Sequence, residues 1–166
     1  MANISCPSGT FKLIGNWTQT MIVNINIIKK EWEEWWYNTV VEGNFALNKT
    51  SLPFWGQGRW AYSHNLERIG ESTGSGTKAS ITTAYLSLCK EMESQDCYIE
   101  VDYVDEEGGC LVLYEATAKL YAKDGKLIVA ETNYTEYQYN KENLKKLGYE
   151  YEELDDDDKN YDNGGN

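Results

Sequence analysis

Few residues of this 166-residue chain have the types and spacing that catalysis requires. The one histidine, His64, lies in a polar segment, where an imidazole can act as a general base but is more often a solvated side chain. A histidine-based metal site is excluded, because zinc sites combine several histidines or closely spaced cysteines. We therefore expect a protein that is not an enzyme and has no metal or cofactor.

Two further segments have the composition of known binding loops but lack key residues. Residues 70–78 are rich in glycine, like a phosphate-binding loop, but a serine replaces the second glycine and no Gly-Lys-Thr follows. Asp158, Asn160 and Asp162 have the spacing that begins a calcium loop, but Asn163 stands where glycine is required. We expect a hairpin loop in the first segment and only loose calcium binding in the second.

The aromatic residues are the strongest indication of a binding site. The chain has 6 Trp and 13 Tyr, and many of its aromatic residues lie between Trp32 and Tyr62. Such rings form the walls of ligand pockets, although they also fill cores from alternating strand positions. We predict a pocket for a small apolar or aromatic ligand, lined by Trp35, Trp60, Tyr62, Tyr85 and Tyr103.

The elements that must position these residues read mostly as β-strands. Residues 98–104 alternate apolar with mainly acidic side chains, as a half-buried strand does, and Asp124-Gly125 is a strong hairpin signal. Residues 21–28 and 80–89 also read as strands, whereas residues 140–148 predict a short helix. The predicted fold is all-β: a small antiparallel barrel or a sandwich with one short C-terminal helix.

The charge distribution predicts one domain followed by a tail. Of the net charge of −12, residues 149–166 carry −7 and residues 1–148 carry −5. We expect a single β-rich domain over 1–148 and a disordered acidic tail over 149–166, because runs of like charge stay solvated. The acidity argues against nucleic acid as a partner, and no apolar run approaches the length of a membrane span.

Glycosylation signals and cysteines favour a secreted protein. Four Asn-x-Ser/Thr sequons and an even number of cysteines suit a secreted glycoprotein with disulfide bonds, although a cytoplasmic or virion location remains the alternative. A hairpin between Cys89 and Cys97 would place these two opposite each other, leaving Cys6 to pair with Cys110. The alternative is that all four cysteines are buried free thiols. The sequons begin at Asn3, Asn16, Asn48 and Asn133.

Two short segments resemble signature segments of the lipocalins, antiparallel barrels that hold a ligand in the barrel mouth. Gly15 and Trp17 match the Gly-x-Trp of the family's first strand. Thr132, Tyr134 and Tyr137 match Thr-Asp-Tyr-x-x-Tyr, with asparagine replacing the aspartate. The resemblance implies a barrel but not a ligand, because the matched residues are structural in the family. The family's third motif is missing, since no arginine follows the second segment, which itself comes late in the chain.

Three functions are consistent with these observations. The first is a non-enzymatic carrier that holds a small apolar or aromatic ligand in a barrel cavity. The second is a viral or phage assembly component, or an inhibitor whose acidic surface binds a basic partner. The third is a carbohydrate-binding module with exposed tryptophan.

Overall fold

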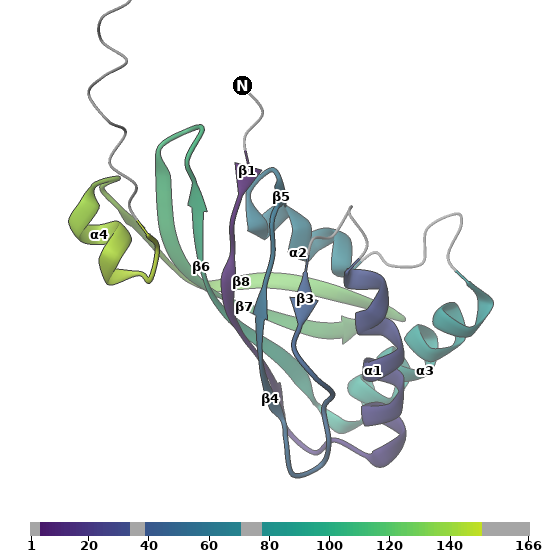
Figure 1. The fold of residues 1–166 in the computed structure, drawn as a ribbon. Helices are drawn as coiled ribbons and strands as arrows, with labels where there is room; N and C mark the ends of the chain where they lie inside the picture. Colours follow the sequence, from purple (N-terminus) through teal and green to yellow (C-terminus); the bar gives the residue numbers. More distant parts are fainter. Residues whose placement is uncertain (1–3, 34–38, 71–77, 151–166) are drawn as a thin grey trace, which may run out of the picture.

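A computed structural model describes residues 4–33, 39–70 and 78–150. Its main feature is one strongly twisted antiparallel sheet of six strands, in the order β3-β4-β2-β6-β7-β8, beside a small sheet of β1 and β5 (Figure 1). The strands are β1 (Ile4–Ser5), β2 (Ser8–Ile14), β3 (Val40–Val41), β4 (Ser51–Trp55), β5 (Gly58–Arg59), β6 (Tyr98–Glu107), β7 (Val112–Lys123) and β8 (Lys126–Tyr137). The helices are α1 (Gln19–Trp32), α2 (Tyr62–Gly70), α3 (Ala79–Gln95) and α4 (Lys141–Lys146).

One face of the sheet is covered by helices and the other is largely open. Helices α1 and α3 pack against each other, α3 contacts β7 and α2 contacts β8. Strand β6 shows the consequence, because Ile99, Val101 and Tyr103 are buried in the core whereas the residues between them are only partly buried. The core therefore lies between the sheet and the helices, and α4 lies apart from it at the far end of β8 (Figure 1).

The structure confirms a β-rich chain with antiparallel strands. It also confirms the strand over residues 98–104, the hairpin turn at Asp124-Gly125 and the short helix after β8. The side chain of Asn140 caps α4 by accepting a hydrogen bond from the backbone N–H of Asn143 at 2.9 Å. The six-stranded sheet is not closed into a barrel, because β3 and β8 stand at its two ends. Residues 151–166 of the expected tail lie outside the described residues.

Two predicted strands are wrong, because residues 21–28 and 80–89 are helical. Their β-branched residues suggested strands, but their buried positions recur every three or four residues, which is the period of a helix. In α1 the buried apolar positions are Met21, Ile22, Ile25, Ile28 and Trp32, and in α3 they are Ile81, Ala84, Tyr85, Leu88, Cys89 and Met92.

A buried carboxylate joins separate elements to the sheet. Asp105 of β6 is fully buried and accepts a hydrogen bond at 2.7 Å from the hydroxyl of Ser5 in β1. It also accepts hydrogen bonds at 2.9 Å from the backbone N–H of Tyr62, which begins α2, and from the hydroxyl of Tyr114 in β7. One side chain thus fixes β1, α2 and β7 relative to β6, and an anion at a helix N-terminus is favourable.

Candidate ligand-binding face

The open face of the sheet carries aligned side chains from five strands. Residues directly paired in antiparallel strands project from the same face. In the first row, Ser8 lies between Trp55 on one side and Val104 on the other, and the row continues through Glu115 to Thr135. This row places a half-exposed tryptophan ring, 50% accessible, beside polar side chains from strands that are far apart in the sequence.

A second row runs parallel to the first. It consists of Pro53, Thr10, Asp102, Thr117 and Asn133, again from β4, β2, β6, β7 and β8. The residues of the two rows that belong to β2, β6, β7 and β8 line an open groove of about 680 Å³, here called the polar groove, and Trp55 and Pro53 of β4 lie next to this lining in the same rows. Its side chains are mostly hydroxyls, carboxylates and one amide, from Ser8, Thr10, Asp102, Glu115, Thr117, Asn133 and Thr135.

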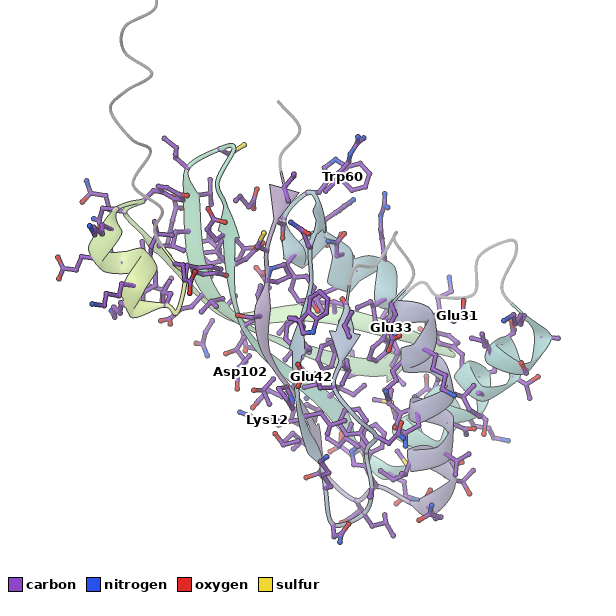
Figure 2. The ribbon with its side chains drawn as sticks, viewed as in Figure 1. Lys12, Glu31, Glu33, Glu42, Trp60 and Asp102 are labelled. Carbon is purple, nitrogen blue, oxygen red and sulfur yellow. The ribbon has the colours of Figure 1, made fainter. Side chains whose placement is uncertain are left out.

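Asp102 at the centre of the polar groove is held as a carboxylate. Its side chain pairs with the ammonium of Lys12 and accepts a hydrogen bond from the hydroxyl of Thr117 at 2.7 Å. Burial alone would raise the pKa of Asp102, but the hydrogen bonds from Lys12 and Thr117 outweigh it and hold that pKa below its ordinary value. Figure 2 shows Lys12 and Asp102 next to each other, on the side of the sheet away from α1. Lys12 also contacts Glu100 at 3.3 Å.

The second carboxylate of the polar groove is also oriented. Glu115 accepts a hydrogen bond from the hydroxyl of Tyr137 at 2.6 Å. The ammonium of Lys146 in α4 lies 4.7 Å from the centre of the Tyr137 ring. Because each carboxylate is fixed by a neighbour, the groove presents acceptors in set positions, and unused lone pairs remain for a ligand.

Of the described residues predicted to line a pocket, Tyr103 lies in the segment of β6 that borders the polar groove, whereas Tyr62 and Tyr85 lie in the core. Tyr62 is fully buried, and its ring lies 5.1 Å from Phe54 and 5.0 Å from Tyr103. The hydroxyl of Tyr85 donates to the carbonyl of Gly70 and accepts from the backbone N–H of Leu127, so this ring is also part of the core.

Of the two predicted tryptophans, the structure describes Trp60. Trp60 is 44% exposed next to β5, under the guanidinium of Arg68 at 4.5 Å, and Figure 2 shows it pointing outward at the edge of the molecule. Trp35 lies outside the described residues. His64 is also exposed, with its Nδ1 3.4 Å from Glu67 Oε2 and its ring against that of Trp60. In the described part of the chain, no group of three histidine, cysteine, aspartate or glutamate residues could hold a metal ion.

The residues of the lipocalin resemblance occupy defined positions. Gly15 follows β2 with a φ of 95°, a conformation that favours glycine, and a side chain there would meet Cys97. The indole N–H of Trp17 donates to the carbonyl of Ile14 at 3.0 Å, and the ring is buried. Thr132, Tyr134 and Tyr137 lie in β8. Membership of that family stays a prediction.

All four cysteines are free thiols in the structure. The predicted hairpin between Cys89 and Cys97 does not exist, because α3 continues through Cys89 to Gln95 and ends at Asp96 with a φ of 50°. Cys97 instead donates a hydrogen bond to the carbonyl of Asn16 at 3.0 Å, and Cys110 is exposed in the turn between β6 and β7. With the thiols unpaired, secretion and glycosylation remain predictions.

Trp55, Asp102 and Thr117 are site residues that the sequence patterns did not predict. The alternation over residues 98–104 did place Asp102 on the face opposite Tyr103. The pairing of β2 with both β4 and β6 had no local signal, however, and this pairing assembles the groove.

Comparison of the chain with protein-family models, with curated proteins and with solved structures finds no match. Of the helices described, none is long and apolar enough to cross a membrane.

Proposed function

We propose that this protein is a non-enzymatic binding protein that holds a carbohydrate in the polar groove, with a sugar ring stacked on Trp55. The observation that carries the proposal is the row joining Trp55 through Ser8 to the groove. An exposed indole beside hydroxyl, carboxylate and amide side chains combines the two kinds of contact that a sugar offers.

The chemistry of the groove supports a polyhydroxylated ligand. Sugar hydroxyls both donate and accept hydrogen bonds, and so they can satisfy carboxylate acceptors and threonine hydroxyls together. The carboxylates of Asp102 and Glu115 suit donating hydroxyls, and hydrogen bonds to charged groups are the stronger ones. The C–H face of a sugar ring is apolar and packs on an aromatic ring.

The apolar-ligand hypothesis has less support. It needs a barrel mouth or another hollow with apolar walls, whereas Tyr62, Tyr85 and Tyr103 are occupied by core contacts. An apolar ligand in the polar groove would shield its polar side chains from water without using the hydrogen-bonding capacity that their protein partners leave open, at a cost of about 1–3 kcal/mol for each group left unsatisfied. A closed lipocalin-like barrel would also require new pairing between β3 and β8, the two ends of the sheet.

The carboxylates of Asp102 and Glu115 are explained more simply by sugar binding than by sugar hydrolysis. Glycoside hydrolysis requires one carboxylic acid with a raised pKa that protonates the leaving group. Asp102 has the opposite property, because Lys12 and Thr117 hold its pKa low despite its partial burial.

The test compares two exposed tryptophans. Retention on immobilised neutral, acidic and amino polysaccharides identifies a ligand class, and calorimetry with a matching oligosaccharide gives the affinity. Trp55→Ala should weaken binding about tenfold or more through lost stacking and burial. Trp60→Ala, which removes a ring of similar exposure away from the polar groove, should leave the affinity unchanged. Absence of retention on every resin, or equal losses in the two variants, would refute the proposal.

A further inference from the structure

Strand β8 forms a long edge of the sheet. It has 12 residues and, among the described strands, pairs only with β7, whereas β3 at the opposite edge has two residues. Edge strands present unpaired backbone N–H and C=O groups that can add another strand, and short edges limit this. The two ends of the sheet therefore differ in their capacity to pair with another chain.

The first part of β8 is covered, but the rest is open. The backbone N–H of Leu127 donates to the hydroxyl of Tyr85 at 2.8 Å, and Gly70 of α2 lies against the carbonyl of Leu127. Residues 131–136 are all exposed. The backbone hydrogen bonds described for residues 128–137 are those of the pairing with β7, and the Thr132 hydroxyl makes one more to the carbonyl of Thr117. Residues 130–137 are called the free edge below.

The free edge carries an exposed aromatic ring among carboxylates. Tyr134 is 52% exposed, and its ring lies 5.2 Å from that of Tyr114. Partial burial raises the pKa of Tyr134, and the negative charges of Glu136, Glu131 and Glu107 raise it further. The negative potential at this ring is therefore set by three separate side chains.

These groups face away from the polar groove. Tyr134, Glu136 and Glu131 pair with Ala116, Tyr114 and Ala118 of β7, which are buried on the helix side of the sheet. Asn133 and Thr135 project from the open face into the groove. A partner at the free edge would thus use side chains distinct from those proposed for the carbohydrate.

We propose that the free edge of β8 accepts an extended basic segment of a partner protein, which pairs as a seventh strand and packs a lysine or arginine on Tyr134 between Glu131 and Glu136. Strand addition supplies affinity through backbone hydrogen bonds, and side chains at alternate positions supply specificity. A cation over a tyrosine ring is favourable, and nearby carboxylates strengthen the attraction.

A second copy of this chain is the poorer occupant. Pairing two β8 edges would bring Glu131 and Glu136 of both copies close together, and each chain carries a net charge of −12. Like charges across paired strands are destabilising. The excess of negative charge selects a basic segment instead.

The experiment uses the full chain and a synthetic peptide of alternating lysine and threonine, with a glutamate–threonine peptide as the reference. Amide hydrogen exchange with and without peptide should show new protection confined to residues 130–137. Glu136→Lys and Tyr134→Ala should each weaken binding of the basic peptide about tenfold. The reference peptide should produce no protection.

Two variants serve as controls. Glu42→Lys makes the same change of charge after β3, at the opposite edge of the sheet, where Glu42 is exposed (Figure 2), and should retain affinity. Trp55→Ala should also bind the peptide normally, which separates this proposal from the carbohydrate site. The proposal is overturned if the peptide protects no amide in residues 130–137, or if Glu42→Lys loses as much affinity as Glu136→Lys. It is also overturned if the free chain is a dimer in which these amides are already protected.

Discussion

At the scale of single residues, Asp105 and Asp102 show that two aspartates on opposite faces of one strand can have different roles. Asp105 points into the core and is fully buried, with donors from Ser5, Tyr62 and Tyr114. Asp102 lies on the open face, 41% exposed, and has Lys12 as its partner. The first stabilises the fold, and the second shapes the polar groove.

The two carboxylates should differ strongly in their effect on stability. Asp105→Ala leaves the N–H of Tyr62 and the hydroxyl of Tyr114 buried without an acceptor, and we expect a loss of about 3 kcal/mol or more in the free energy of unfolding. Asp102→Ala removes a solvent-screened ion pair and should cost about 1 kcal/mol or less. Urea denaturation of both variants measures the difference, and similar losses would contradict the role assigned to Asp105.

Local signals at the scale of elements predict only part of the fold. The alternation over residues 98–104, the Asp124-Gly125 turn and the Asn140 cap depend on near neighbours, and the structure confirms them. The helices α1 and α3 were mistaken for strands because isoleucine and threonine favour strands, whereas their packing against each other settles the conformation. Predicting the polar groove would have required the register of β2 with both β4 and β6, and no local sequence pattern contains this information.

The stability of helix α1 depends on its N-cap residue, Thr18. The hydroxyl of Thr18 accepts a hydrogen bond from the backbone N–H of Met21 at 3.2 Å and donates to Glu91 of α3 at 2.8 Å. Thr18→Ala should lower the free energy of unfolding by about 1–2 kcal/mol, because it removes the N-cap and the link to α3. Thr20→Ala changes an exposed threonine within α1 and should be neutral or slightly stabilising. Thermal unfolding of the two variants tests this, and an unchanged melting temperature for Thr18→Ala would argue against the cap.

At the scale of the whole molecule, the described residues form one large sheet, a small second sheet, and helices α1, α2 and α3 on one side of the large sheet, and this asymmetry decides where partners can bind. The helices fill one face with core contacts, so the remaining surfaces of the sheet are its open face and its β8 edge. The open face has mixed charge, with Lys12 between Glu100 and Asp102, whereas the β8 edge has carboxylates around Tyr134. The two surfaces therefore suit different ligands, one polyhydroxylated and one cationic.

The integrity of this helix-on-sheet packing can be followed through Cys89. Its thiol is fully buried on α3, and burial raises its pKa from the ordinary 9.0 to about 11. Because the pKa of Cys89 is higher in the folded chain, the unfolded chain releases the proton first as the pH rises. The contribution of this thiol to stability is complete below pH 9 and is lost as the pH rises toward about 11.

Alkylation with iodoacetamide in native buffer, read by mass spectrometry, should modify exposed Cys110 rapidly and Cys89 only at the rate of global unfolding. Denaturant should make both react at once, whereas resistance of Cys89 and Cys97 in denaturant without reductant would reveal a disulfide and contradict the free thiols.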